Sequence, residues 1–375
     1  MKTITFFNNK GGVGKTTLVY HLAYMLAEQG YKVLAADLDP QSNLTAMFLE
    51  DKLEDLWMNN DADRTILSAV KPLMKGLGDI KSLITEEINH NLSLIIGDLG
   101  LSSFEDKLSD AWIKSSDGDE AAFRTVSSFY RIIQDAAEQQ QSDVVLMDVG
   151  PNLGAINRAA LIATDFVIMP VAPDLFSVKG LMNLGPTLMD WRTKWKARLE
   201  KNPEPSLPLP AGDMKPMGYV VLQHNVRSSR PSLARPGLAR PGLARPGLDR
   251  PGLDRPGLDR PVKAYLKWAK RLPKVYRKYV LDDASATEGI AVENDPYQLG
   301  FLKHYQSLMP MAMEVRKPIF RLKPADGAIG AHAQAVKDCY RDFQELAEKI
   351  AEVAEVTKSG VSSPDVPKQT TLFEL

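Results

Sequence analysis

Cysteine is almost absent from this sequence of 375 residues, which contains only Cys339. A single cysteine excludes a disulfide framework, a cysteine-rich zinc site and a cluster bound by several thiolates of one chain. The five histidines are scattered and show no metal-binding spacing. No apolar run approaches the roughly 18 residues of a membrane-spanning helix, and the amino terminus lacks a signal-peptide pattern. We therefore expect a cytoplasmic protein without a membrane partner.

The sequence also lacks an excess of either charge, because 46 Lys and Arg residues oppose 47 Asp and Glu residues, for a net charge of −1 at pH 7. A surface for nucleic acid would therefore have to be a local patch. In contrast, the hydrophobic content of 44% is ample for a buried core. The length fits one large α/β domain or two ordinary ones.

A glycine-rich loop, NNKGGVGKTT at residues 8–17, joins a strand-like stretch to an apolar pattern of helical period. In this context backbone N–H groups and the helix N-terminus bind phosphates, the Lys15 ammonium meets the β and γ phosphates, and the Thr16 hydroxyl binds Mg²⁺. The alternative is a turn that is merely rich in glycine. The usual G-x-x-x-x-G-K-[ST] pattern is not met, because Asn9 replaces its first glycine and Lys10 precedes a glycine pair.

The segment KGGVGKTT resembles the deviant Walker A motif of the ParA/MinD-type ATPases. Three further stretches resemble the same family: KVLAADLDPQSNLTAMFL at 32–49, the Walker B strand and following loop at 143–181, and the closing segment with the last helix at 316–350. The resemblance leaves out 50–140 and about 225–310. It implies an α/β fold of the P-loop NTPase type, with a mostly parallel twisted sheet and helices on both faces. It also implies ATP and Mg²⁺ as cofactors and a homodimer that forms on ATP.

The resemblance further assigns roles to single residues. Lys10 would reach the partner subunit's phosphates, Asp39 would position the attacking water, and Asp37 would lie near magnesium. Asp148 ends an apolar strand, where a carboxylate can hold the magnesium shell. For Asp37 a turn or helix cap is the alternative. The predicted site comprises catalytic Lys10 and Asp39, the metal ligands Thr16, Asp37 and Asp148, and the nucleotide-binding residues Gly11, Gly12, Val13, Gly14, Lys15, Thr16 and Thr17.

Strand and helix patterns alternate, which predicts a parallel sheet covered on both faces. Strands are expected at 3–7, 32–37, 92–96, 143–148, 166–171, 217–222 and 318–321, and helices at 15–29, 121–140, 178–196 and 331–354. The last helix carries Cys339 on its apolar face, which indicates a core thiol rather than a reactive one. We expect one ATPase domain over 1–355 that is interrupted by an insert at 226–310 and followed by a flexible tail at 356–375.

The insert opens with a pentapeptide repeated six times at 230–261, in which proline at every fifth position forbids a regular helix. This pattern favours a passive linker, and weak phosphate contact by its arginines is the alternative. The basic segment, 262–281, follows with seven basic and no acidic residues beside an apolar stripe. Because ParA-type proteins bind DNA non-specifically through basic residues toward the carboxyl end, its lysines and arginines are candidates for DNA contact: Lys263, Lys267, Lys270, Arg271, Lys274, Arg277 and Lys278. A merely solvated charged face is the alternative.

These features predict a switch that binds bulk DNA as an ATP dimer and is released when a ParB-type partner stimulates hydrolysis. It would partition or position a plasmid, chromosome or other cargo, and would be nucleoid-associated. Alternatively, the same switch serves defence signalling or assembly of a complex, and DNA is irrelevant. Near the carboxyl end, QTTLF resembles the Q-x-x-L-F peptides that dock on bacterial sliding clamps. A tail that folds back on its own domain or on the dimer partner is the alternative.

Overall fold

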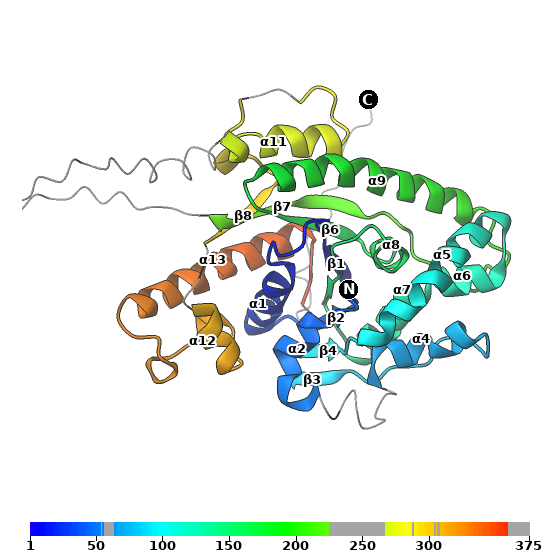
Figure 1. The fold of residues 1–375 in the computed structure, drawn as a ribbon, viewed down its shortest axis with the longest axis horizontal. Coiled ribbons are helices and arrows are strands. Elements are labelled where there is room, and N and C mark those ends of the chain that lie inside the picture. Colours follow the sequence, from blue (N-terminus) through cyan, green and yellow to red (C-terminus); the bar gives the residue numbers. More distant parts are fainter. Residues whose placement is uncertain are drawn as a thin grey trace, which may run out of the picture.

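The fold is given by a computed structural model, which describes residues 1–53, 55, 64–224, 267–286, 289–303, 305 and 308–358 (Figure 1). Within these ranges one eight-stranded sheet has the order β3-β4-β2-β5-β1-β6-β7-β8. Every neighbouring pair is parallel except β3 with β4. The expected mostly parallel sheet is confirmed. Its strands are β1 Lys2–Phe6, β2 Val33–Asp37, β3 Glu86–Asn89, β4 Leu92–Ile95, β5 Val144–Asp148, β6 Phe166–Val171, β7 Lys215–His224 and β8 Gln298–Lys303.

Helices cover both faces of the sheet, as Figure 1 shows. The helices α1, α2, α12 and α13 contribute to one hydrophobic core, and α4 to α9 with α11 contribute to the other. Alternate residues of one strand therefore enter different cores: Val33 joins the first and Leu34 the second. The helices are α1 Lys15–Glu28, α2 Asn43–Leu49, α4 Ile66–Lys75, α5 Glu105–Lys114, α6 Glu120–Val126, α7 Ser128–Gln139, α8 Ala155–Ile162, α9 Leu175–Leu199, α11 Leu272–Val275, α12 Leu308–Glu314 and α13 Ala331–Val353.

Two of the predicted elements are wrong in detail. The expected strand at 318–321 is a 3-10 turn, Ile319–Arg321. Its first amide donates to the buried ring of His21 at 3.1 Å, so it is held by helix α1 instead of a neighbouring strand. The expected helix at 121–140 is split into α6 and α7. The break falls at Ser127, whose hydroxyl donates to the Phe123 carbonyl one turn earlier at 2.7 Å.

Part of the predicted insert belongs to the sheet, because Gln298–Lys303 forms β8 beside β7. In the basic segment, α11 and the π-helical turn Tyr276–Val280 pack against α9. Pro273 lies in the first turn of α11, where a proline is tolerated, and does not break the helix there. The pentapeptide repeats, Lys263 and the QTTLF motif lie outside the described residues, so the linker and clamp interpretations stay predictions.

Candidate phosphate and magnesium site

The glycine loop places backbone N–H groups at the start of α1. Gly12 and Gly14 have φ angles of 71° and 93°, which side chains with a Cβ rarely adopt. Gly14 is the N-cap of α1, and no side chain caps the helix. The N–H groups of the first turn consequently point out of the helix without a side-chain acceptor, which is the arrangement that binds an anion.

Lys15 lies inside the loop, where its Nζ donates to the carbonyl of Asn8 at 3.2 Å. Burial lowers the pKa of Lys15, and the nearby carboxylates of Asp148 and Asp39 oppose that shift. Among the described residues the ammonium thus has negative charge beside it and donates a hydrogen bond to a carbonyl alone. Phosphate oxygens would supply the acceptors that its other two protons need.

Asp148 is fully buried at the end of β5. Burial and the neighbouring Asp37 raise the pKa of Asp148 to about 8, while the Thr16 hydroxyl and Lys15 lower it. Within the described part of the chain, neither carboxylate oxygen makes a hydrogen bond of ordinary geometry. A buried carboxylate in this situation is costly unless a cation compensates it. Its position next to Thr16 therefore fits magnesium, which prefers oxygen ligands and needs few from the protein.

Asp37 lies at the same edge of the sheet, but its oxygens are engaged. Oδ2 accepts hydrogen bonds from the amide and hydroxyl of Thr45 at 2.7 and 2.8 Å. Burial nonetheless raises the pKa of Asp37 to about 7. These contacts fix α2, which is the alternative, structural role, and the place of Asp37 near magnesium stays a prediction. Among the described residues no three His, Cys, Asp or Glu side chains gather as a metal site.

Asp39 faces the pocket from the loop after β2. Its Oδ1 accepts from the amide of Gln41 at 3.0 Å. Gly150, in the loop after Asp148, packs so closely that a Cβ there would lie 3.3 Å from Asp39 Oδ1. Asn157 of α8 holds this loop by donating to the carbonyls of Gly150 and Asn152 at 2.8 and 2.6 Å. The loop after Asp148 is therefore held in close contact with Asp39.

Lys10 is held by groups at the start of helix α9. Its Nζ donates to Asp174 Oδ2 at 2.5 Å and lies 5.8 Å from the centre of the Phe176 ring. Asp174 is also the N-cap of α9, because its Oδ1 accepts from the Ser177 amide at 2.8 Å. Burial opposes ionisation, but the bonds from Lys10 and Ser177 hold the pKa of Asp174 below its usual range. Within one chain, Lys10 is therefore bound to α9.

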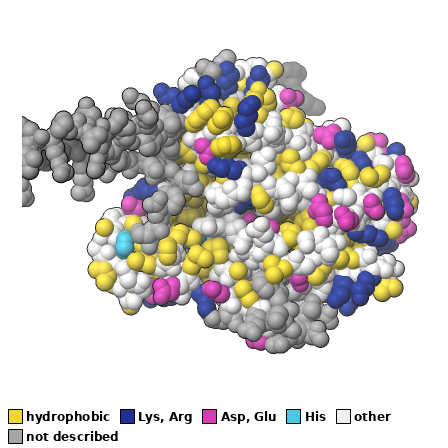
Figure 2. Space-filling model, in the orientation of Figure 1, with side chains coloured by type: hydrophobic (Ala, Val, Ile, Leu, Met, Phe, Trp, Pro, Cys, Tyr) yellow, Lys and Arg dark blue, Asp and Glu magenta, His cyan; other side chains and the backbone are white. Residues whose placement is uncertain are grey.

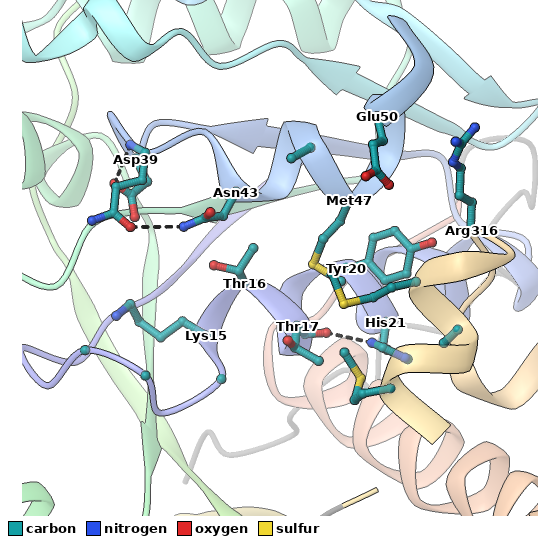
Figure 3. A pocket seen from close by; sticks show the side chains of 18 of the residues that line it. Lys15, Thr16, Thr17, Tyr20, His21, Asp39, Asn43, Met47, Glu50 and Arg316 are labelled. Atoms are coloured by element: carbon teal, nitrogen blue, oxygen red, sulfur yellow. Dashed lines mark hydrogen bonds between the residues drawn. The ribbon is translucent and has the colours of Figure 1, made fainter. Parts of the chain in front are cut away.

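One pocket of about 500 Å³ opens onto the phosphate loop and Asp39, whereas Lys10, Asp37 and Asp148 do not line it. Figure 3 shows Lys15, Thr16 and Asp39 at one end and Tyr20, Met47 and Arg316 at the other. The described part of the chain thus brings together most of the predicted site: Gly11, Gly12, Gly14, Lys15, Thr16, Thr17 and Asp39 line the pocket. Val13 is buried behind the loop instead, with 2% of its surface exposed. The volume is in the range of nucleotide-sized ligand sites.

Three residues of this region have no role in the sequence-based prediction. The sequence does contain a local signal for Asp174, because an aspartate directly before a helix is a typical N-cap residue. For Asn157 and Glu105, the neighbouring sequence contains no signal that predicts their role. Glu105 accepts from the amides of Ala155 and Ile156 at 2.5 and 2.9 Å, and so caps α8 from a position 50 residues away in sequence. Only the tertiary fold makes such a contact.

The basic segment divides into exposed and anchoring side chains. Lys267, Lys270, Arg271 and Lys278 are exposed. Figure 2 shows Lys and Arg side chains gathered over α11. Arg277 instead bonds to the buried Asp295 at 3.2 Å, and the same carboxylate accepts from the Tyr219 hydroxyl of β7 at 2.7 Å. Arg277 therefore anchors the segment to the sheet, which makes it a poor candidate for phosphate contact.

No helix in the described ranges is long and apolar enough to cross a bilayer. A family model described as an AAA domain matches residues 1–201, more than half of the chain. An uncharacterized protein of Methanocaldococcus jannaschii is 31% identical over 235 residues, which cover 62% of this chain and 76% of the relative. A virulence plasmid ParA family protein of Chlamydia psittaci is 28% identical over 185 residues. That alignment covers 49% of this chain and 62% of the relative, which is less than two thirds of its length.

Solved structures share the fold over almost the whole chain. A Corynebacterium diphtheriae protein has a TM-score of 0.63 at 23% identity, with 94% of this chain and 99% of that one covered. A putative plasmid partition protein from Borrelia burgdorferi, bound to AMPPNP, has a TM-score of 0.51 at 18% identity and covers 94% and 98%. At these identities the similarity concerns the fold alone.

Proposed function

Because the chain belongs to the ParA/MinD-type P-loop ATPases, we propose that it hydrolyses ATP as a molecular switch. As an ATP-bound homodimer it would bind DNA without sequence preference, and it would leave the DNA when a partner of ParB type stimulates hydrolysis. The cargo would be a plasmid, a chromosome or another large body. The protein would then be cytoplasmic and associated with the nucleoid.

The observation that carries the ATPase proposal is the buried carboxylate of Asp148, without an ordinary hydrogen bond among the described residues, beside Thr16 and Lys15. The carboxylate and the hydroxyl suit magnesium, and the ammonium beside them suits a triphosphate. Magnesium, when bound, neutralises charge on the phosphate oxygens. The residues Thr16 and Asp148 would hold it, with Asp37 behind them.

The protein's own groups divide the remaining work. The N–H groups of the loop and the Lys15 ammonium hold the phosphates, and Asp39 faces the same pocket, where it can orient a water molecule. Lys10 would add positive charge from the partner subunit, which stabilises the charge that develops during phosphoryl transfer. Since Lys10 is bound to Asp174 in the single chain, dimerisation would have to exchange that bond for one to phosphate.

Two of the similar proteins support this proposal. The Borrelia neighbour is a putative plasmid partition protein bound to AMPPNP, an ATP analogue. The Chlamydia relative is a virulence plasmid protein of the ParA family. The exposed lysines and arginine of the basic segment provide the positive surface that non-specific DNA binding requires.

Steady-state ATP hydrolysis, measured with and without duplex DNA of unrelated sequences, tests the proposal. We expect magnesium-dependent turnover that DNA changes regardless of its sequence. Asp148→Asn should abolish the magnesium-dependent turnover, and Asp39→Ala should accumulate the ATP dimer because hydrolysis is slowed. Turnover that no DNA alters, together with no DNA binding in ATP, would instead favour a switch in another system, such as defence signalling or complex assembly.

A further inference from the structure

The loop between β5 and α8, residues 149–154 and here called the β5–α8 loop, lies against the phosphate loop and Asp39. Pro151 lines the pocket, and a Cβ at Gly11 of the phosphate loop would lie 3.9 Å from Pro151 Cγ. A Cβ at Gly150 would lie 3.3 Å from Asp39 Oδ1, so the loop backbone passes directly beside that carboxylate. A displacement of the β5–α8 loop would therefore alter the position of the Asp39 carboxylate.

Glu105 of α5 holds the far end of this loop, where α8 begins. Gly154 is the N-cap of α8 and has no side chain to cap the helix. The Glu105 carboxylate takes that role, because Oε1 accepts from the Ala155 amide at 2.5 Å and Oε2 accepts from the Ile156 amide at 2.9 Å. A Cβ at Gly154 would lie 2.5 Å from Oε1, so only glycine at this position admits the carboxylate. A side chain that is 50 residues away in sequence thus sets where the loop ends and the helix starts.

A second contact fixes α8 to the same helix. The Arg158 Cζ of α8 lies 4.5 Å from the centre of the Trp112 ring on α5 and 5.9 Å from that of the Trp191 ring on α9. Trp112 follows Glu105 on α5 by about two helical turns, so both side chains lie on one face of that helix. The helices α5 and α8 lie side by side (Figure 1). Glu105 and Trp112 together leave α8, and the β5–α8 loop before it, little freedom to move relative to α5.

These contacts form a continuous path from α5 to Asp39. Glu105 fixes the first turn of α8, and Asn157 in that turn donates to the carbonyl of Gly150 at 2.8 Å. Glu105 itself does not line the pocket, so it does not touch a nucleotide bound there. We propose that Glu105 is a positioning residue for hydrolysis, which acts through α8 and the β5–α8 loop to hold Asp39 where it orients the attacking water. This inference rests on the proposed ATPase function and adds a residue outside the nucleotide pocket that sets the rate of turnover.

Single-turnover hydrolysis and calorimetric titration of ATP with Mg²⁺, both on the full chain, separate positioning from binding. Glu105→Ala should slow hydrolysis about tenfold and leave ATP affinity within about twofold, because it displaces Asp39 but removes no group that binds the nucleotide. Added to Asp39→Ala, it should slow hydrolysis by less than about twofold more, because Glu105 acts through Asp39. Glu105→Gln keeps one acceptor oxygen and should lie between Glu105→Ala and the unaltered chain. Gly154→Ala should act like Glu105→Ala, because the new Cβ would displace the carboxylate from α8.

Asp119→Ala is the matched control, because it removes another acidic helix cap, the acceptor of the Ala122 amide at 2.7 Å at the start of α6. It should lower the melting temperature, as Glu105→Ala should, but leave the rate of hydrolysis within about twofold. Unchanged hydrolysis in Glu105→Ala would overturn the positioning role. An equal loss of hydrolysis and ATP affinity would also overturn it, and so would a full further loss in the Asp39→Ala background. If the unaltered chain bound ATP without hydrolysing it, the proposed ATPase function itself would fail, which is a different result.

Discussion

The two lysines of the phosphate loop differ in what holds them. Lys15 is buried against a backbone carbonyl beside two aspartates, whereas Lys10 is half-buried and paired with Asp174. We expect Lys15→Ala to lose nucleotide binding, because no other ammonium lies inside the loop. Lys10→Ala should keep ATP binding but lose ATP-dependent dimerisation and turnover. Light scattering with ATP decides this, and an unchanged ATP dimer in Lys10→Ala would exclude action across the interface.

Asp174 competes with the partner's phosphates for Lys10 if the trans role is correct. Asp174→Asn should still cap α9, since asparagine is an equally good N-cap, but it removes the charge that holds Lys10. The ATP dimer should therefore form at a protein concentration roughly 2–5-fold lower, as expected for the loss of a partly exposed ion pair. Asp190→Asn, which breaks the exposed pair with Lys194 on the same helix, is the control. A weaker dimer in Asp174→Asn would contradict the competition.

At the scale of elements, α9 contacts both the phosphate loop and the basic segment. A Cβ at Gly180 would lie 2.6 Å from Asn9 Oδ1, and a Cβ at Gly185 would lie 1.8 Å from the Tyr279 carbonyl oxygen. The second distance leaves no room for any side chain. Two glycines about one and a half turns apart thus let α9 touch the nucleotide loop and the candidate DNA surface at once.

Gly185→Val should push the turn Tyr276–Val280 off α9 and move the basic segment with it. We expect DNA affinity to fall about tenfold or more, while ATP affinity stays within twofold. Filter binding and nucleotide titration measure the two quantities on the same sample. Asn183→Ala, an exposed change two residues away, is the control. Equal loss of ATP and DNA binding would indicate general unfolding rather than a displaced segment.

Asp79 joins the loop after α4 to α6 and α7 by accepting hydrogen bonds from Arg124 and Arg131 at 2.6 to 2.9 Å. Burial works against ionisation, but these bonds lower the pKa of Asp79 to about 2. Its stabilising contribution is thus complete above the unfolded pKa of about 4 and is lost as the pH falls toward 2. Asp79→Asn should lower the melting temperature at pH 7 and much less near pH 2. The exposed Asp110→Asn should change neither, and an equal loss at both pH values would contradict the linkage.

A helix or strand can be predicted from the sequence when the residues that cause it are consecutive, and not when distant contacts cause it. Helix α1 and strand β5 carry their period in consecutive residues, so their bounds are close to those predicted. Strand β8 contains Gly300, which weakens its strand signal in the sequence, and it pairs with the edge strand β7. The turn Ile319–Arg321 has an apolar composition that suits a strand, but its amide bonds to His21. The same holds for the site. The phosphate loop and Asp148 could be predicted from motifs, whereas the roles of Asp174 and Glu105 depend on tertiary packing.

In the whole molecule, the basic segment is fixed to the sheet that carries the phosphate loop. Asp295 bonds both Arg277 of the segment and Tyr219 of β7, and Leu222 farther along β7 approaches Gly14 of the loop. The candidate DNA surface is therefore anchored to the ATPase core. The charge of Arg277 is paired with Asp295 in that anchor. The exposed cations Lys267, Lys270, Arg271 and Lys278 remain as the phosphate-contacting set, with Lys274 half-buried beside them.

If four or five of these cations meet phosphates, the logarithm of the DNA association constant should fall with the logarithm of the salt concentration with a slope of roughly −3.6 to −4.5. Charge reversal of Lys267, Lys270 and Lys274 to Glu should abolish DNA binding in ATP and leave ATP affinity intact. Fluorescence anisotropy with two unrelated duplexes measures both the slope and the absence of sequence preference.

The same charge change elsewhere on the surface, at the exposed Lys71, Lys75 and Lys107, controls for the altered net charge of the protein. It shifts long-range attraction equally but removes no contact of the basic segment, so binding should weaken only slightly and the salt slope should persist. Equal loss in both triple variants would mean that net charge alone drives binding. Full DNA affinity in the first variant would remove the basic segment from the mechanism and leave the ATPase switch without its proposed DNA surface.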